Sequence, residues 1–338
     1  MIFNFIKKKI YKIIIFHFYD RVKIKKKPIF SKTKIKPKYF LICNLSSLGG
    51  MFSNLKIVLN GICEAEKNKL KPEVDMQNYP TLYNDNDIKF TKNSWLYYFK
   101  PLSGGLDKAL KSSFVINQHN KIKQELIQNK KRNFFLRKIY KKKIIIDKKL
   151  LNIADKFYKK NFQKKKTIAL HFRGTDAKIT PSHNFPPTLT QVEEFLENYL
   201  KKNKVDKIFL ITDELEYLKY FKLKYKHMIC FWKSFRSNKS KIFNLNLRKK
   251  HNYKIGRDNI VDMIILSKID TIIYSQSNLV EFAIFHSDID VIKTYKLQNG
   301  VNSKNILISL FLWKIKNILP SAIGGFKNKA KIKKIFIN

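Results

Sequence analysis

The chain has 338 residues, of which 44% are hydrophobic and 14% aromatic, enough to bury a sizeable core in two domains of ordinary size. Its formal net charge is +45, but the lysines are scattered along the chain and do not form one stripe. Abundant Lys, Ile, Asn, Phe and Tyr together are typical of an AT-rich genome. The charge therefore favours compositional drift plus attraction to an anionic membrane or substrate, and argues against a specific nucleic-acid partner.

Three cysteines, Cys43, Cys63 and Cys230, stand far apart in the sequence and have neither paired spacing nor metal-ligand spacing. This usage predicts thiols that pack as small hydrophobic side chains in a reducing cytosol, without a disulfide or a zinc site. We therefore expect a cytoplasmic protein, with peripheral attachment to the inner face of the cytoplasmic membrane as an option.

The N-terminal segment, residues 1–30, is basic and rich in aromatic side chains. Lysines at positions 7, 8, 9 and 12 interrupt its apolar residues, so no run approaches the roughly 18 to 20 residues of a membrane-spanning helix. It also lacks the small-residue cleavage site of a signal peptide. Two interpretations stay open: a segment in the headgroup region of an anionic bilayer, or a terminal helix packed on the protein.

The pattern of strand, polar turn and helix occurs in both halves of the chain. Residues 39–43 predict a buried strand, followed by a glycine-containing loop and a helix over 55–66. The same unit recurs at TIALHF, KIFLIT and TIIYS, three apolar runs that are each followed by polar residues and a helical segment. This alternation predicts a parallel α/β sheet in each half.

A lysine-rich helical stretch, residues 141–166, separates the two halves. Neither a G-x-G-x-x-G fingerprint nor a P-loop occurs, which disfavours a nicotinamide dehydrogenase and a P-loop nucleotidase. We therefore predict two lobes whose ligand lies at the carboxyl ends of the strands. The expected parts are a lead segment over 1–30, an N-terminal lobe over 31–155, a C-terminal lobe over 156–300, and a C-terminal helix with a basic tail over 301–338.

The sequence HFRGTDAK places His171, Arg173 and Asp176 at the carboxyl end of a predicted strand. An arginine there can donate two hydrogen bonds to a phosphate, and Gly174 lets the chain turn sharply and approach a ligand closely. Asp176 can orient the arginine or cap a turn. A simple ion pair between Arg173 and Asp176 is the alternative interpretation.

Polar residues also follow the other two strands of this half. Ser275, Ser277 and Asn278 lie between a strand and a helix, where hydroxyl groups and free backbone N–H groups form an anion site, although N-capping alone explains Ser277 equally well. Asp213 and Glu214 directly follow KIFLIT, and helix capping is their default interpretation.

One further carboxylate, Asp262, lies among apolar residues at helical spacing in GRDNIVDMIILSK. A carboxylate in such a setting must find hydrogen-bond donors, such as a purine edge or a neighbouring lysine.

The ordered set LHFRGTD, FLITDE, GRDNIVDMIILSK and SQSNL spans residues 167–285. It resembles the superfamily of inverting, GDP-fucose-dependent α1,6-fucosyltransferases and nodulation fucosyltransferases. The segments GGMFSN, PEVDMQNYPTLYND and NSWLYYFKP are similar to parts of bacterial and protist relatives.

The resemblance implies a GT-B fold, with two Rossmann-like lobes and a ligand cleft between them, and an enzyme that moves fucose from GDP-fucose to a hydroxyl of a glycan acceptor. The acceptor side would be the lobe over 31–155, and the nucleotide sugar would bind the lobe over 156–300. The basic N-terminus suggests a surface polysaccharide or a lipid-linked oligosaccharide as the acceptor. It implies no obligatory metal and no other cofactor. Fixed cationic donors would stabilise the departing diphosphate. Carried over by position, His171 and Asp262 contact guanine, Arg173 and Ser277 hold the β-phosphate, and Asp176 and Asp213 shape the donor site.

The chain departs from the mammalian-type pattern around the arginine. Where that pattern has a second arginine, this chain has Gly174. Where the pattern has a lysine directly after the aspartate, this chain has Ala177, and Lys178 follows one position later. Pro181 stands at the position of a glutamate that is considered as a base in that pattern. The general base is therefore open among His183, Glu214 and Asp75. His183 is nearest to the motif in sequence, and an imidazole can accept a hydroxyl proton near neutral pH.

Two rival functions remain at the level of sequence. The triplets at 85–87 and 288–290 fit a D-x-D pattern, which could ligate Mn²⁺ or Mg²⁺ in a GT-A transferase that uses another nucleotide sugar. A non-enzymatic basic protein that binds membrane or RNA is the second rival, and only the charge supports it.

Overall fold

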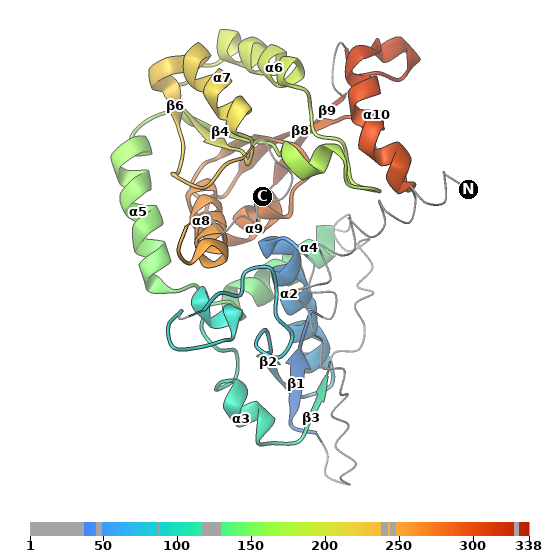
Figure 1. Ribbon diagram of the computed structural model, residues 1–338. Coiled ribbons are helices and arrows are strands. Elements are labelled where there is room, and N and C mark those ends of the chain that lie inside the picture. The colour runs from blue at the N-terminus through green and yellow to red at the C-terminus, as the bar shows by residue number, and fades with distance from the viewer. Residues whose placement is uncertain are drawn as a thin grey trace, which may run out of the picture. The chain divides into compact units, whose positions relative to one another are not determined.

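The computed structural model describes residues 37–44, 49–86, 88–116, 130–237, 243, 248–327 and 331–337. The chain divides into two compact units, Met1–Ile145 and Ile146–Asn338 (Figure 1). The lead segment over 1–30 lies outside the described residues. Within the described ranges, no helix combines the length and the apolar composition needed to cross a bilayer.

The first unit contains a three-stranded parallel sheet in the order β2-β1-β3. Helix α2 connects β1 to β2 and begins at Met51, four residues before the predicted start. Gly50 occupies the N-cap without a side-chain bond, and the Met51 amide instead donates to the Tyr83 hydroxyl at 2.6 Å. The elements of this unit are β1 (Tyr39–Ile42), α2 (Met51–Lys67), β2 (Lys71–Val74), a 3-10 helix (Ser94–Tyr97), α3 (Leu106–Leu110), β3 (Phe114–Ile116) and α4 (Lys130–Lys143).

Two contacts fix the loops and the helix of this unit against its sheet. The buried Glu73 carboxylate accepts hydrogen bonds from the backbone amides of Leu102, Ser103 and Gly105. A Cβ atom on Gly61 of α2 would lie 2.7 Å from Ile42, so the absence of a side chain allows the helix to approach β1 closely.

The second unit contains a six-stranded sheet in the order β6-β5-β4-β7-β8-β9. Every neighbouring pair is parallel except β8 with β9, which is antiparallel. The predicted strands at TIALHF, KIFLIT and TIIYS are confirmed as β4, β5 and β7. The strands are β4 (Thr167–His171), β5 (Lys207–Ile211), β6 (Ile229–Cys230), β7 (Thr271–Tyr274), β8 (Ile292–Gln298) and β9 (Lys331–Ile337).

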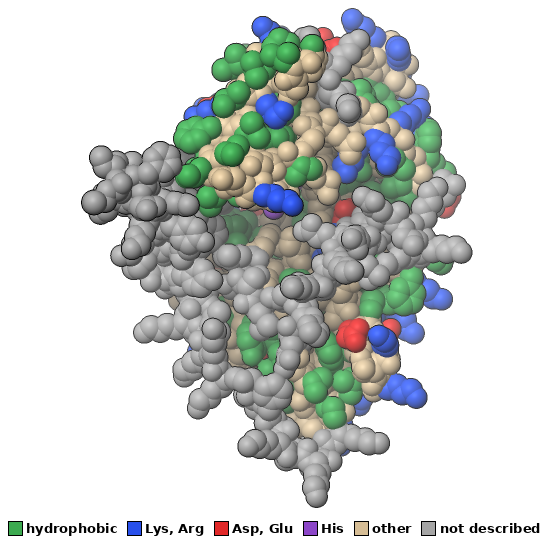
Figure 2. Space-filling model, turned by 90° about the vertical axis from the view of Figure 1, so that its right-hand side faces the viewer, with side chains coloured by type: hydrophobic (Ala, Val, Ile, Leu, Met, Phe, Trp, Pro, Cys, Tyr) green, Lys and Arg blue, Asp and Glu red, His purple; other side chains and the backbone are tan. Residues whose placement is uncertain are grey.

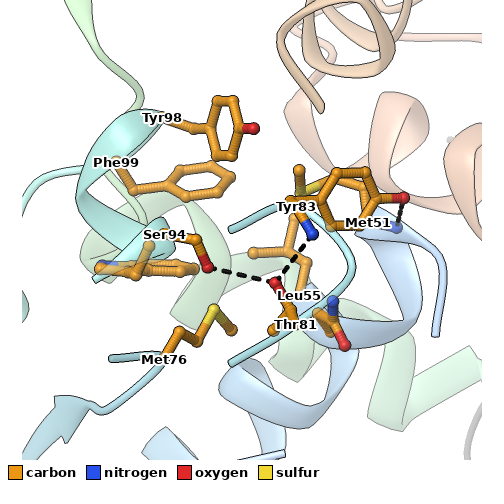
Figure 3. A pocket seen from close by; sticks show the side chains of 10 residues that line it. Met51, Leu55, Met76, Thr81, Tyr83, Ser94, Tyr98 and Phe99 are labelled. Carbon is orange, nitrogen blue, oxygen red and sulfur yellow. Dashed lines mark hydrogen bonds between the residues drawn. The ribbon is translucent and has the colours of Figure 1, made fainter. Parts of the chain in front are cut away.

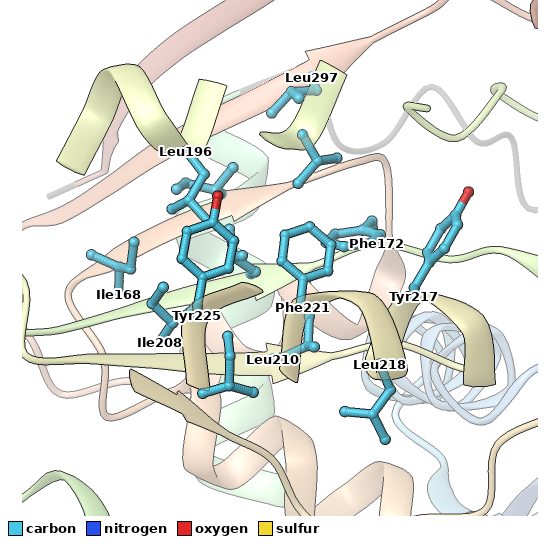
Figure 4. Packing of buried hydrophobic residues seen from close by; sticks show 14 residues of the cluster. Ile168, Phe172, Leu196, Ile208, Leu210, Tyr217, Leu218, Phe221, Tyr225 and Leu297 are labelled. Carbon is cyan, nitrogen blue, oxygen red and sulfur yellow. The ribbon is translucent and has the colours of Figure 1, made fainter. Parts of the chain in front are cut away.

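Helices cover both faces of this sheet (Figure 1). Alternate strand residues such as Ile168, Leu170 and Leu210 pack with α6 and α7 in the cluster of Figure 4, whereas Phe209, which points to the other face, packs on Phe162 of α5. Near-continuous apolar strands are what a sheet buried on both faces requires. The helices are α5 (Lys148–Phe162), α6 (Leu189–Lys202), α7 (Leu215–Tyr225), α8 (His251–Leu266), α9 (Asn278–His286) and α10 (Ile306–Ile318), with short 3-10 turns at Thr175–Lys178, Lys226–Met228 and Ser321–Ile323.

The lysine-rich stretch between the halves forms two helices. After α4 ends at Lys143, the Asp147 carboxylate accepts a hydrogen bond from the Lys149 amide at 2.8 Å and starts α5. The boundary between the two compact units falls in this break, after Ile145.

The strand order places the three polar loops that carry candidate site residues at one edge of the sheet. β4 lies between β5 and β7, and His171 is in register with Ile211 on one side and with Tyr274 on the other. Because all three strands are parallel, the residues that follow them emerge side by side.

Candidate active site

Arg173 is the exposed cation of the loop after β4. Its Nη2 donates to Asp176 Oδ1 at 2.5 Å, and its Nε lies 3.9 Å from Asp213 Oδ2. The Arg173 side chain keeps 40% of its surface accessible, so a ligand can still reach the guanidinium. Two carboxylates thus hold this arginine in place. The predicted ion pair between Arg173 and Asp176 is confirmed, and it leaves the guanidinium partly accessible.

Asp213 and Glu214, from the end of β5, hold the backbone of that loop. Asp213 accepts from the Gly174 amide and from the Thr175 hydroxyl, both at 2.8 Å. Glu214 accepts from the Thr175 amide at 3.2 Å and pairs with Lys178 Nζ at 2.7 Å. The capping interpretation is wrong for Glu214: it occupies the N-cap of α7, but its carboxylate makes no capping bond because the neighbouring loop uses it.

The contact with Glu214 explains the glycine in HFRGTDAK. A Cβ atom on Gly174 would lie 1.6 Å from Glu214 Oε2 and 2.7 Å from Glu214 Cβ. The close approach that the glycine permits is therefore to a buried carboxylate of the neighbouring strand end, and its φ of −113° needs no left-handed turn.

His171 and Ser277 meet at the junction of β4 and β7. The Ser277 hydroxyl lies 3.5 Å from His171 Nε2 and accepts a hydrogen bond from the Leu279 amide at 3.2 Å, so the predicted N-cap of α9 is confirmed. Asn278 is the first residue of that helix. Burial of the imidazole, together with the nearby charge of Arg173, lowers the pKa of His171 to about 3, so this side chain is neutral at physiological pH.

Asp262 is buried in the middle of α8, and its Oδ1 finds no hydrogen-bond partner in the part of the chain that the structure describes. Burial raises the pKa of this carboxyl well above its ordinary value, Arg236 opposes the shift, and Asp258 adds to it. The nearby cation is thus an arginine, where the sequence suggested a lysine.

Arg236 is a residue that the sequence pattern did not single out. It lies in the loop after β6, where its guanidinium donates to the carbonyls of Ser234 and Trp232 at 2.9 and 3.0 Å. Burial lowers the pKa of Arg236, and Asp262 is the first of three carboxylates that counter this shift. The only available signal was a basic and aromatic run, FWKSFR, directly after a strand.

A second buried carboxylate, Asp258, lies one turn before Asp262 on α8. It accepts hydrogen bonds from the Trp232 indole at 3.2 Å and from the Arg257 guanidinium at 2.7 Å, and Arg248 lies 3.5 Å from its other oxygen. These contacts connect the loop after β6 to the helix that carries Asp262.

The three candidate bases have different surroundings. His183 is exposed, and its backbone carbonyl accepts from the Asn302 amide at 2.7 Å. The pKa of His183 is lowered, because desolvation of the ring and the charge of Arg173 outweigh the opposite effect of Asp176. Both charged groups of the loop therefore influence the protonation of this imidazole. Glu214 is engaged by Lys178, and Asp75 lies in the first unit, where it accepts from the amides of Gln77 and Asn78.

One D-x-D triplet lies at the opposite edge of the second unit's sheet from this cluster, and the other belongs to the first unit. Asp288 and Asp290 precede β8, at the amino-terminal edge of the parallel strands, and Asp85 lies in the first unit, while Asp87 is outside the described residues. Among the described residues, no group of three His, Cys, Asp or Glu side chains is arranged to hold a metal ion.

The first unit has a small pocket beneath α2 (Figure 3). The Thr81 hydroxyl pairs with Ser94 at 3.1 Å, and Tyr83 caps Met51, so the polar groups near the pocket bond to one another. None of the lining side chains is charged. The lining residues are Met51, Asn54, Leu55, Met76, Thr81, Tyr83, Ser94, Trp95, Tyr98 and Phe99.

Solved structures with a similar fold include fucosyltransferases. NodZ alpha-1,6-fucosyltransferase co-crystallized with GDP superimposes with a TM-score of 0.54 at 12% identity, over 79% of this chain and 97% of that chain. NodZ soaked with GDP-fucose gives a TM-score of 0.54 at 14% identity, over 79% and 98%. Fucosyltransferase NodZ from Bradyrhizobium gives 0.53 at 12% identity, over 80% and 100%.

The chain has a fucosyltransferase-like fold. The expected α/β fold class of GT-B type is thereby confirmed. The sequence itself matches no protein-family model and no curated protein.

Proposed function

We propose that this protein is an inverting glycosyltransferase that moves fucose from GDP-fucose to a hydroxyl group of a glycan acceptor. The observation that carries the proposal is that an accessible arginine and a serine-capped helix start follow the neighbouring strands β4 and β7 at the same edge of the sheet. Both features bind anions. Structures of similar fold were obtained with GDP and with GDP-fucose, which supports this choice of donor.

The diphosphate is assigned to Arg173 and to the start of α9. The contact between His171 and Ser277 brings the end of β4 to this helix start, so both anion-binding groups can reach the same ligand. A planar guanidinium and backbone N–H groups stabilise the charge that develops on the leaving GDP. We assign this role to the protein's own groups and propose that no metal ion or other cofactor is obligatory.

Guanine recognition is assigned to His171 and Asp262. The neutral imidazole offers one donor and one acceptor, and the Asp262 carboxylate can accept from the N1 and N2 positions of guanine. Burial raises the pKa of Asp262 and so favours its protonated form. Hydrogen bonds from guanine would favour the ionised carboxylate instead, and the charge of Arg236 acts in the same direction.

Transfer joins the acceptor oxygen to the anomeric carbon from the face opposite the diphosphate. The bond between that carbon and the β-phosphate oxygen breaks, and its electron pair leaves with GDP. We assign the hydroxyl proton to His183, whose lowered pKa leaves the ring free to accept it at neutral pH. Asp176 and Asp213 act by holding Arg173 and the backbone of its loop.

The acceptor is proposed to be a surface glycan or a lipid-linked oligosaccharide. The basic N-terminal sequence supports this choice of acceptor. It also supports peripheral attachment of the lead segment to the inner face of an anionic membrane. No specific nucleic-acid partner is proposed, because the lysines do not form a stripe.

Thermal unfolding in the presence of EDTA tests the donor assignment. We expect GDP to raise the melting temperature more than UDP, ADP or pyrophosphate at equal concentration. A hydrolysis screen over GDP-fucose, GDP-mannose, UDP-sugars and dTDP-sugars then identifies the sugar. A strict requirement for Mn²⁺ or Mg²⁺, or equal stabilisation by every anion, contradicts the proposal.

Replacement of Arg173 tests the phosphate role within the same assay. Arg173→Ala should abolish transfer, and Arg173→Lys should lose most of it, because a point charge does not reproduce a bidentate fork. Lys219→Ala, an exposed lysine of α7, is the control for loss of a positive charge. Near-normal turnover of either Arg173 variant, with a native circular dichroism spectrum, removes the assignment.

A further inference from the structure

Helix α10 exposes a row of large apolar side chains. Ile308, Phe311, Ile315 and Ile318 follow one another at helical spacing, and between 51% and 74% of the surface of each is accessible. We call these four residues the α10 stripe. Side chains at this spacing lie along one side of a helix. In a globular protein such a side normally faces the core.

The opposite side of α10 is fixed to the second unit, so the stripe cannot turn inward without breaking contacts. Ser309 is fully buried, and its backbone carbonyl accepts from the Asn302 side chain at 3.1 Å. Lys178 Nζ lies over the Trp313 ring, 4.8 Å from the ring centroid. After the helix, the Phe326 amide donates to the Lys316 carbonyl and the Phe326 ring packs on Phe185.

The segment of the chain that carries the stripe contains only positive charges. Residues 291–338 contain ten lysines and no Asp or Glu. Lys304 precedes the helix, and Lys314 is exposed on it next to Ile315. Figure 2 shows the side of the molecule on which α10 lies, where hydrophobic side chains and basic side chains are interspersed in the upper part of the view.

We propose that the α10 stripe is a docking surface for an anionic lipid bilayer. With 13 residues the helix is about 20 Å long, too short to span a bilayer but suited to lie in the plane of the headgroups. Its apolar side chains enter the acyl boundary, and the lysines contact lipid phosphates.

The charge decides between a bilayer and a second copy of this chain. Two copies joined through the stripe would bring two lysine-rich, acid-free segments together, which costs free energy by like-charge repulsion. An anionic membrane supplies the complementary charge over a flat area. The proposal is separate from the membrane expectation for the lead segment, because it concerns a different element, and it does not depend on the proposed enzymatic activity.

Co-sedimentation with vesicles tests the proposal on the full-length protein. Vesicles of phosphatidylcholine with phosphatidylglycerol are compared with vesicles of phosphatidylcholine alone. Phe311→Ser combined with Ile315→Ser should weaken binding to the anionic vesicles by roughly tenfold or more, because two apolar side chains no longer enter the lipid. The matched control is Leu223→Ser combined with Phe134→Ser, which removes two exposed apolar side chains from α7 and α4.

The electrostatic part has its own pair of variants. Lys314→Glu should weaken binding several-fold, whereas Lys219→Glu on α7 should leave it within about twofold, and 1 M salt should abolish the difference by shortening the screening length to about 3 Å. Circular dichroism confirms that each variant is folded. Since every variant keeps the lead segment, differences among them report on α10.

Three results overturn the proposal: binding to anionic vesicles that the stripe variants leave unchanged, equal binding to neutral vesicles, or a dimer in light scattering that the stripe variants dissociate while no vesicle binding is found.

Discussion

The shape of the loop after β4 depends on one carboxylate and one missing side chain. Glu214 fills the space that a Cβ atom at position 174 would occupy. It also accepts from the Thr175 amide and neutralises Lys178, so a displaced Glu214 would leave both groups without their partner. The backbone position of Arg173 therefore depends in part on contacts of Glu214 that this arginine does not itself make, in addition to its own contacts with Asp176 and Asp213.

Gly174→Ala should destabilise the protein by about 2 kcal/mol or more, since overpacking beside a buried carboxylate cannot relax locally. The double variant Gly174→Ala with Glu214→Ala should recover part of this loss, because it removes the clash with Glu214 Oε2 and leaves only the contact with the Cβ atom at 2.7 Å. Urea unfolding of the three proteins measures the effect. A single variant as stable as the parent would show that Glu214 moves away at little cost and does not hold the loop.

Buried groups at the proposed donor site predict how the free energy of unfolding depends on pH. The folded pKa of His171, about 3, lies below the ordinary value of about 6.5, so its contribution is complete above pH 6.5 and is lost as the pH falls toward 3. Asp262 has a raised pKa, so its contribution has the opposite sign: stability falls as the pH rises from about 3.9 through the raised value.

His171→Gln should flatten the loss of stability between pH 6.5 and pH 4, where a single histidine accounts for up to about 1.4 kcal/mol per pH unit. Asp262→Asn should make the same acid loss steeper, because the opposing contribution is gone. Urea unfolding at several pH values measures both slopes, with His227→Gln, at an exposed histidine, as the control. A His171→Gln slope equal to the parent's would refute the role of burial.

At the scale of elements, helix α9 combines a cap with the proposed phosphate site. The Ser277 hydroxyl accepts from the Leu279 amide, and an aspartate at this position can make the same bond. Ser277→Asp should therefore keep the melting temperature within a few degrees but abolish GDP binding, since it places a negative charge where the diphosphate is assigned. Ser277→Ala should lose about 1 kcal/mol of stability.

The matched control for Ser277 lies on α10. Asn305 caps that helix by accepting from the amides of Leu307 and Ile308. Asn305→Asp and Asn305→Ala should reproduce the stability effects of the two Ser277 variants while leaving GDP binding unchanged. Undiminished GDP binding by Ser277→Asp would separate α9 from the phosphate site.

The sequence predicted strands better than it predicted contacts between them. Three apolar runs gave β4, β5 and β7, because a sheet buried on both faces leaves a strong local signal. The contact of Glu214 with Thr175 joins residues 39 positions apart, and helix capping was the better local interpretation. The start of α2 was missed for a similar reason, since the hydroxyl that caps Met51 belongs to Tyr83, 32 positions away.

Arg236 shows the same limit within the candidate site. Its bonds to Ser234 and Trp232 are local, but its significance comes from the buried carboxylates of α8, which only the fold brings near. The sequence motifs proposed His171, Arg173, Asp213, Asp262 and Ser277 as candidates, whereas Arg236, whose charge opposes the raised pKa of Asp262, had no motif of its own.

At the scale of the whole molecule, all the side chains assigned to the donor belong to the second unit. A fragment of residues 146–338 should therefore unfold cooperatively and bind GDP with an affinity near that of the full chain, because its sheet and both helical layers are complete. Transfer to an acceptor should be lost, since the first unit is assigned to the acceptor side. Calorimetry with GDP measures the affinity, and residues 1–145 serve as the comparison fragment.

A fragment 146–338 that melts cooperatively but does not bind GDP would place part of the donor site in the first unit. A fragment that does not fold would show that the second unit needs the first for stability.

The pairing of Gly174 with Glu214 has an evolutionary consequence. Glutamate at 214 and any side chain at 174 compete for one volume, so the two positions should change together among chains of this fold. Where a relative carries arginine at the place of Gly174, as in the mammalian-type pattern, the residue at the place of Glu214 must be small or must point elsewhere. The loop around Arg173 then needs a different support, and a single substitution is not a neutral path from one arrangement to the other.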